Sequence, residues 1–115
     1  MAARPPVGWF PRRGEVYRVS LPGGKRRPAV VLSADALNRF ALDVCLIPLT
    51  SVHHGEFSLR VTLAAGEGGV DRDSWAKCEQ VHTVEKKLLL YPPLGRLPAP
   101  SLRRIEAAVR AALEL

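Results

Sequence analysis

The sequence has few cysteines, few aromatic residues and no long apolar run. Its 115 residues include only two cysteines, Cys45 and Cys78. Two cysteines cannot form the dense disulfide framework of a small secreted domain, so we expect two buried free thiols. No apolar run approaches the roughly 18 residues of a membrane-spanning helix, and no apolar stretch follows Arg4 as a secretory signal requires. We therefore expect a cytoplasmic protein that does not contact a membrane.

Motifs for metal, nucleotide or nucleophilic chemistry are also missing. The chain has no Cys-x-x-Cys or His-x-x-x-His spacing, and the adjacent His53 and His54 would point to opposite faces of a strand. The glycines at 66, 68 and 69 do not lie between a strand and a helix as in a phosphate loop. No Gly-x-Ser-x-Gly elbow is present. The expectation is an absence of metal and of cofactor.

Basic residues exceed acidic ones. The chain has 17 Lys and Arg against 11 Asp and Glu, a formal net charge of +6 at pH 7. This balance suits an anionic partner such as a nucleic acid, although a basic surface that only keeps the protein in solution remains an alternative.

The length indicates a single domain. Residues 1–11 hold three prolines and read as a flexible leader, which leaves 12–115 as the domain. Short strands separated by Gly and Pro, followed by one amphipathic helix, predict a compact antiparallel β-barrel with a helix packed on it. The expected strands are 15–21, 29–32, 42–49, 57–63, 74–78 and 80–84, with 64–73 a mobile connection and 88–97 irregular with at most one short strand. Two helical segments are expected, a single turn at 35–38 capped by Ser33 and a C-terminal helix capped by Ser101.

Two polar clusters stand at the ends of apolar strands. Arg26 and Arg27 form a basic loop before Pro28, which is expected to begin a strand because proline donates no ladder hydrogen bond. Thr50 and Ser51 follow the neighbouring apolar run. If the two strands pair, the guanidinium groups and hydroxyls meet at one edge and suit a phosphate. The alternative is that Arg27 pairs with a surface acid and Thr50 caps a turn.

A third polar cluster is Glu79-Gln80, between apolar residues. Carboxylate and amide groups can hydrogen-bond base edges, and a nearby Trp75 or Phe57 could stack on a base. The alternative is an exposed strand edge.

The order of these short motifs resembles the MazF/PemK toxin family. The similarity covers roughly residues 12–115. The matching segments are Arg13-Gly14-Glu15-Val16-Tyr17, Arg27-Pro28-Ala29-Val30-Val31-Leu32-Ser33, Asn38-Arg39-Phe40, Pro48-Leu49-Thr50-Ser51, Asp73-Ser74-Trp75-Ala76, Glu79-Gln80-Val81-His82-Thr83-Val84-Glu85-Lys86 and Leu94-Gly95-Arg96-Leu97.

The resemblance implies a fold, a reaction and partners. The expected fold is mainly β, a small Src-homology-type antiparallel barrel with an amphipathic C-terminal helix. The expected protein is the homodimeric toxin of a type II toxin–antitoxin system, a metal-independent, sequence-specific endoribonuclease. It would cut single-stranded RNA to 2′,3′-cyclic phosphate and 5′-hydroxyl ends. A cognate acidic, MazE-like antitoxin would occupy the RNA groove, and operator DNA would be bound only through that antitoxin.

By position, the resemblance also assigns site residues. Arg27 matches the family's catalytic arginine and Thr50 its catalytic threonine. An arginine is a poor general base because its pKa exceeds about 12, so the base is open between His53 and Glu79. The residues expected to contact RNA are Lys25, Arg26, Ser51, His53, Glu79 and Gln80.

The sequence departs from the family pattern at two places. The loop before Arg27-Pro28 is shortened to residues 22–26, and His82 replaces a usual arginine. Two other functions remain open, a CcdB-like DNA gyrase poison and an RNA-binding barrel without catalysis. The Arg-Pro and Thr-Ser pairs argue against the gyrase poison, because CcdB lacks them.

Overall fold

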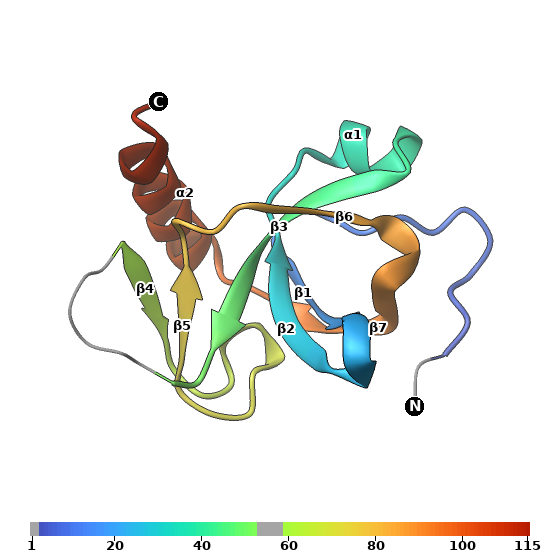
Figure 1. The fold of residues 1–115 in the computed structure, drawn as a ribbon, viewed down its shortest axis with the longest axis horizontal. Coiled ribbons are helices and arrows are strands. Elements are labelled where there is room, and N and C mark those ends of the chain that lie inside the picture. Colours follow the sequence, from blue (N-terminus) through green and yellow to red (C-terminus); the bar gives the residue numbers. More distant parts are fainter. Residues whose placement is uncertain (1–2, 53–58) are drawn as a thin grey trace.

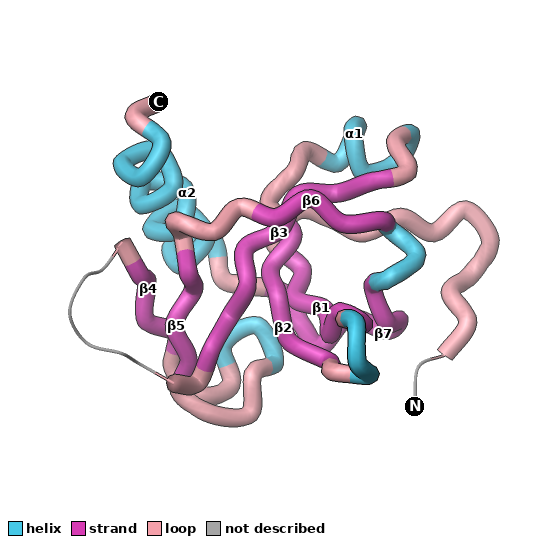
Figure 2. The backbone as a smooth tube through the Cα atoms, in the orientation of Figure 1, coloured by secondary structure: helices cyan, strands magenta, loops and turns pink. Residues whose placement is uncertain are grey.

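The computed structural model describes residues 3–52 and 59–115, and it consists of an antiparallel sheet with a C-terminal helix beside it (Figure 1). The strands are β1 (Glu15–Ser20), β2 (Arg26–Val31), β3 (Asp43–Thr50), β4 (Arg60–Leu63), β5 (Ser74–Lys77), β6 (His82–Glu85) and β7 (Leu89–Arg96). The helices are α1 (Asp35–Phe40) and α2 (Ala99–Leu113), and three short 3-10 turns are η1 (Pro22–Gly24), η2 (Glu67–Gly69) and η3 (Lys86–Leu88). Figure 2 shows how these turns join the strands.

The sheet runs β4-β5-β3-β2-β1-β7, with β6 added to β3, and every pairing is antiparallel. The predicted antiparallel β-fold with a C-terminal helix is confirmed. Within the described residues no pairing joins β4 to β7, so the sheet is strongly bent but is not closed into a complete barrel.

Strands β1, β2 and β3 bury side chains on both faces. Successive residues of a strand point to opposite sides, and here each side meets a separate apolar cluster. One cluster, next to α2, contains Val16, Val30, Ile47, Leu49, Val61, Leu63, Val70, Ala76, Cys78, Leu97, Ile105 and Val109. The other contains Tyr17, Val19, Ala29, Val31, Val44, Leu46 and Leu89. The three strands therefore form a wall between two cores.

Strand β2 begins earlier than the sequence predicted. Arg26 and Arg27 belong to the strand rather than to a basic loop, and Pro28 lies inside it, opposite Arg18 of β1. This proline is tolerated because the pairing of β2 with β3 covers only Ala29 to Val31, so Pro28 stands at the margin of the ladder. The prediction that Pro28 begins the strand was wrong.

Helix α1 is a turn and a half, slightly longer than predicted, and Ser33 does not cap it. The helix follows Ala34 without a side-chain cap. The Ser33 hydroxyl instead donates to Asn38 Oδ1 and accepts from the Cys45 N–H at 3.0 Å. The buried polar pair thus ties the helix to β3.

The segment predicted to be a mobile connection, 64–73, is held against the sheet. Val70 is buried in the core, and the η2 backbone touches β7. A Cβ placed on Gly69 would lie 2.1 Å from the Leu94 carbonyl oxygen, and one on Gly95 would lie 2.7 Å from the Gly68 carbonyl carbon. The two backbones can approach this closely only because both surfaces are glycine.

Strand β7 itself was predicted to be irregular, and the structure shows an eight-residue strand. Its pairing with β1 shifts register between Val16 and Arg18. Strand β5 lies between β3 and β4, and β4 is the edge strand.

Helix α2 packs beside β4 and is tied to the η2 turn by one polar contact (Figure 1). The helix begins at Ala99 after Pro98, so the prediction of Ser101 as its cap was wrong. Ser101 is buried, and its hydroxyl donates to Glu67 Oε1 at 2.6 Å. This bond, with one from the Ala64 N–H, lowers the pKa of Glu67.

Part of the leader also contacts the domain. The Ala3 N–H donates to the Tyr91 carbonyl, and the Trp9 ring meets Tyr17 and Tyr91 edge-on. Burial and the hydrogen bond to Glu15 raise the pKa of Tyr17. The flexibility of residues 1–11 stays a prediction.

Both thiols are free, as expected, but their surroundings differ. Cys78 is buried, and burial raises its pKa to about 11. Cys45 is only partly buried, so the expectation of two buried thiols was wrong for Cys45. No helix among the described residues is long and apolar enough to cross a membrane.

We expect Ser101→Ala to lower the free energy of unfolding by about 1–2 kcal/mol at neutral pH, as for a hydrogen bond to a charged group. The hydrogen bond favours the ionised form of Glu67, so it stabilises the folded protein fully at pH values above the pKa that this carboxyl has in the unfolded chain. This stabilisation is lost as the pH falls through the lowered pKa of the folded state. Urea unfolding at neutral and acidic pH measures both values. Glu67→Gln should remove the pH-dependent part, whereas an equal loss for Ser101→Ala at both pH values would contradict this explanation.

We expect Gly95→Ala to destabilise the protein by about 2–3 kcal/mol, because the new methyl group overlaps the η2 backbone. Gly23→Ala is the control. Its φ of +82° is unfavourable for alanine, but a Cβ there has no neighbour within 4 Å, so about 1 kcal/mol is expected. Equal losses in the two variants, measured by urea unfolding, would rule out the close approach as the cause.

Candidate functional site

A hollow of about 260 Å³ opens where β1, β2 and β3 meet the loop between η2 and β5. Its lining comes from five segments. These are β1 with Arg18, β2 with Arg26, Arg27 and Pro28, the end of β3 and the residues after it with Leu49, Thr50, Ser51 and Val52, the stretch from the end of η2 to the start of β5 with Gly69, Val70, Asp71, Arg72 and Ser74, and β7 with Leu94. The predicted meeting of the two polar clusters at one edge is therefore confirmed.

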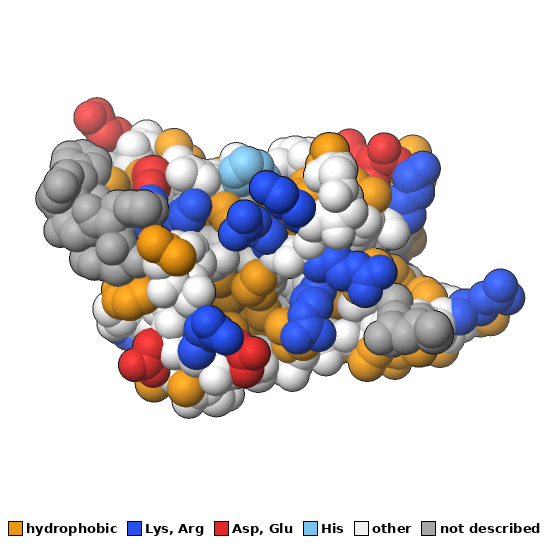
Figure 3. Space-filling model, turned by 60° about the horizontal axis from the view of Figure 1, so that its bottom comes forward, with side chains coloured by type: hydrophobic (Ala, Val, Ile, Leu, Met, Phe, Trp, Pro, Cys, Tyr) orange, Lys and Arg blue, Asp and Glu red, His pale blue; other side chains and the backbone are white. Residues whose placement is uncertain are grey.

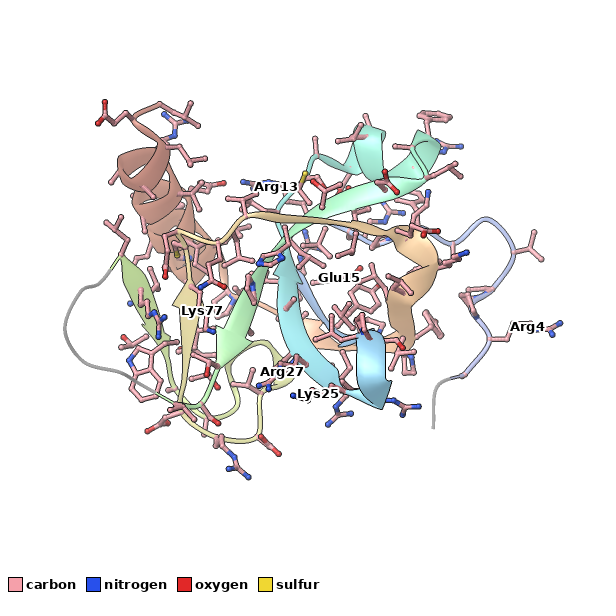
Figure 4. The ribbon with its side chains drawn as sticks, in the orientation of Figure 1. Arg4, Arg13, Glu15, Lys25, Arg27 and Lys77 are labelled. Carbon is pink, nitrogen blue, oxygen red and sulfur yellow. The ribbon has the colours of Figure 1, made fainter. Side chains whose placement is uncertain are left out.

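The strand register brings Arg27 and Thr50 to the same end of the sheet. The antiparallel ladder of β2 and β3 ends at the pair Ala29 and Pro48, and beyond it Thr50 pairs with Trp75 of β5. Arg27 and Thr50 each lie two residues past that last pair, and both line the hollow. Figure 4 shows Arg27 at the lower end of β2, at the open edge of the wall.

The Thr50 hydroxyl is held by the turn that follows β3. Its Oγ1 accepts from the Val52 N–H at 3.1 Å, and it lies 3.4 Å from the Val52 carbonyl oxygen. In this second contact the hydroxyl donates to the carbonyl over a long distance, so a ligand oxygen in the hollow that approaches more closely would replace it.

The two arginines of β2 in the hollow are not neutralised by the described residues. Among the described residues, neither the Arg26 nor the Arg27 guanidinium has a hydrogen bond or ion pair. The alternative of a surface ion pair for Arg27 is thus not observed there. Arg18, Arg26, Arg27 and Arg72 all line the hollow, against one carboxylate, that of Asp71. Figure 3 shows basic side chains bordering this face.

Four lining residues were missed by the sequence reasoning, namely Arg18, Asp71, Arg72 and Ser74. Arg18 had a usable signal, since it is the outward member of an alternating strand. The other three lie in or next to the segment taken for a mobile connection, and only the contact of η2 with β7 brings that segment to the site.

Other predicted site residues lie elsewhere. Lys25 is exposed in the turn before β2 and does not line the hollow (Figure 4). Glu79 and Gln80 do not line the hollow either, since they follow Lys77 at the far end of β5 from Ser74. Glu79 is exposed and forms an ion pair with Arg60, with 3.6 Å between Oε2 and Nη2. His53 and Phe57 lie outside the described residues.

Across residues 3–52 and 59–115, no group of three His, Cys, Asp or Glu side chains is arranged to hold a metal ion. The hollow therefore offers guanidinium groups and hydroxyls, a donor set for oxyanions such as phosphate.

Comparison with known proteins places the whole domain in one group. Residues 12–113 match the family described as "PemK-like, MazF-like toxin of type II toxin-antitoxin system". "Endoribonuclease MazF9" of Mycobacterium tuberculosis is 31% identical, over 90% of this chain and 97% of that protein. "Probable endoribonuclease MazF5" of the same organism is 32% identical, over 91% and 94%.

Solved structures share the fold. A mycobacterial endoribonuclease in complex with its cognate antitoxin superposes with a TM-score of 0.78 at 26% identity, covering 91% of this chain and 96% of that one. A MazE–MazF structure from Deinococcus radiodurans gives a TM-score of 0.79 at 26% identity, covering 93% and 98%.

Proposed function

This chain belongs to the PemK-like, MazF-like toxin family of type II toxin–antitoxin systems, and on that premise we propose that it cleaves single-stranded RNA at the Arg27–Thr50 hollow. The observation that carries the assignment to this hollow is that Arg26 and Arg27, which form no ion pair within the described residues, line it together with Thr50. The naming of the two mycobacterial relatives as endoribonucleases supports the activity.

The proposed reaction is a transphosphorylation within the RNA. The ribose 2′-hydroxyl loses its proton and its oxygen attacks the adjacent phosphorus. The bond from phosphorus to the 5′-oxygen then breaks, and that oxygen takes up a proton. The products are a 2′,3′-cyclic phosphate and a 5′-hydroxyl, and the atoms balance without a metal ion or cofactor.

Arg27 is proposed to stabilise the transition state. Negative charge on the non-bridging oxygens rises as the five-coordinate phosphorus forms, and a planar guanidinium can donate two parallel hydrogen bonds to them. Thr50 is proposed to donate its hydroxyl proton to the same oxygens while the Val52 N–H holds its oxygen. Arg26 and Ser51 would bind flanking phosphates from the same lining.

Residues outside the hollow would contact the RNA beyond the cleaved phosphate. A single strand long enough to pass from the hollow along β5 would reach Glu79 and Gln80, and Lys25 stands at the entrance beside β2. Of the two candidates for the base at the 2′-oxygen, Glu79 lies outside the hollow and pairs with Arg60, which argues against it because a base must reach the proton that it removes. His53, outside the described residues, stays a candidate.

The partners follow from the same charges. We propose that an acidic, flexible antitoxin tail covers the arginine-lined hollow, since carboxylates satisfy the same donors as phosphates. We also propose that the toxin is a homodimer, that it meets operator DNA only through the antitoxin, and that it acts in the cytoplasm, where its RNA substrate is translated.

The activity is tested by incubating the purified protein with a long RNA in EDTA. We expect discrete fragments with cyclic-phosphate ends, and a rate at least about 100-fold lower for Arg27→Ala and for Thr50→Val. Arg103→Ala, an exposed arginine of α2 far from the lining, is the control and should cut normally.

Three outcomes would contradict the assignment. Undiminished cleavage by Arg27→Ala would exclude this site. Intact RNA together with trapped DNA gyrase complexes would indicate a gyrase poison. Tight binding of RNA without any product would indicate an RNA-binding barrel.

We expect the affinity for an uncleavable RNA, with a 2′-deoxyribose at the cleaved position, to fall steeply with salt. The logarithmic slope should lose about 0.7 in Arg18→Ala if this side chain contacts one phosphate. Fluorescence anisotropy across a series of salt concentrations measures the slope. An unchanged slope would remove Arg18 from the RNA-binding surface.

A further inference from the structure

The loop between η2 and β5 supplies the one carboxylate among the described lining residues. We propose that Asp71 is a specificity-determining residue that reads a nucleobase next to the cleaved phosphate and selects guanine. The inference rests on the proposed ribonuclease function and names what that site recognises.

Among Glu67, Asp71 and Asp73, Asp71 is the one whose carboxylate accepts no backbone or hydroxyl hydrogen bond from the described residues. Glu67 accepts from Ser101 and from the Ala64 N–H, and Asp73 accepts from the Ala65 N–H at 2.9 Å. The one described partner of Asp71 is the adjacent Arg72, at 3.7 Å, with side chains 82% and 71% exposed. An exposed pair of this kind contributes almost nothing to stability, so the carboxylate is available to a ligand.

A carboxylate in this position opposes phosphate binding. It stands in the same hollow as four arginines and would repel a polyanion. It gains from RNA where it meets hydrogen-bond donors, which are the ribose 2′-hydroxyls and the N–H groups on the edges of the bases, and only the base edges differ between nucleotides. Ionised aspartate is an acceptor with two oxygens. Guanine presents two adjacent donors, N1–H and N2–H, on its Watson–Crick edge, which match these two oxygens, and no other standard base does so.

The backbone behind Asp71 is fixed before RNA arrives. The preceding residue, Val70, is buried in the core, and Gly69 lies against the Leu94 carbonyl. On the other side, the Ser74 hydroxyl donates to the Arg72 carbonyl at 2.9 Å. A recognition group held this way loses little conformational entropy on binding.

The turn between β1 and β2, on the other side of the hollow, does not supply a side chain that could recognise a base there. The turn between β1 and β2 is short and exposed, and none of residues 22–25 lines the hollow. Of the two turns described on either side of the hollow, only the loop that carries Asp71 therefore supplies a carboxylate for base selection.

The experiment maps all cleavage sites of the wild type and of Asp71→Asn on one long RNA, then measures rates on short RNAs made from the preferred site. We expect a guanine within two nucleotides of the cleaved bond. Replacing it with inosine, which lacks the N2 amino group, should slow the wild type by about ten- to hundredfold, the discrimination of a bidentate contact. Asp71→Asn should cut the guanine and inosine RNAs at similar rates and accept other bases at that position. Asp73→Asn is the matched control and should keep the wild-type preference.

Each result that contradicts the proposal has a different meaning. A wild type that cuts no RNA would overturn the proposed function itself. A wild type that cuts RNA, with Asp71→Asn using the same sites at the same relative rates, would overturn only this inference. Uniform loss of cleavage in Asp71→Asn, with unchanged binding of the 2′-deoxy RNA, would make Asp71 the general base and would also overturn the reading role. Thermal unfolding of both variants verifies that neither substitution alters the fold.

Discussion

The wall formed by β1, β2 and β3 is the constraint on which the rest of the structure depends. Because apolar clusters cover both of its faces, hydrophobicity alone does not fix the register of β2. A slip of one residue would exchange one buried valine for another. The polar ends of the strands resolve this ambiguity, since a slip would draw Arg27 toward the buried part of the wall, at a cost of several kcal/mol for an unpaired charge. Arg27, proposed to bind RNA, therefore also disfavours a slip of β2 in that direction.

The strands of this wall follow largely from patterns of neighbouring residues, so the sequence predicts most of them. The alternation after Gly14 and the apolar runs around Val30 and Ile47 gave the strands, and the 3.6-residue period gave α2. The meeting of Arg27 and Thr50 also followed from the sequence, because it needs only that two neighbouring apolar strands pair. The boundaries were less predictable. Pro28 could enter β2 because β3 pairs only beyond it, a feature of the sheet rather than of the dipeptide.

The errors share a cause in contacts between distant residues. Ser33 and Ser101 both resemble helix caps, yet each hydroxyl is used by a partner elsewhere in the chain, Asn38 and Cys45 for the first and Glu67 for the second. The segment 64–73 has the composition of a mobile loop. It is ordered because glycines at 68 and 69 meet another at 95, and a period-based reading of either segment contains no information about the other. Asp71 and Arg72 were missed for that reason.

The charges of the hollow show how one surface can serve two kinds of ligand. Four arginines give a field that attracts any flexible polyanion, whether RNA or an acidic peptide, and a field of this kind does not distinguish base sequences. Discrimination between ligands needs groups whose interaction with the wrong ligand is unfavourable in free energy. The carboxylate of Asp71, the one acid among the described lining residues, meets this condition, because it is repelled by phosphate and by acidic side chains and is satisfied by N–H donors. On this argument Asp71 weakens binding to RNA in general and to an acidic tail, and it strengthens binding only where a suitable base is present. The loop that carries Asp71 is held in place by the close glycine contact. In this part of the site, binding is thus weaker for polyanions in general and more selective for one base.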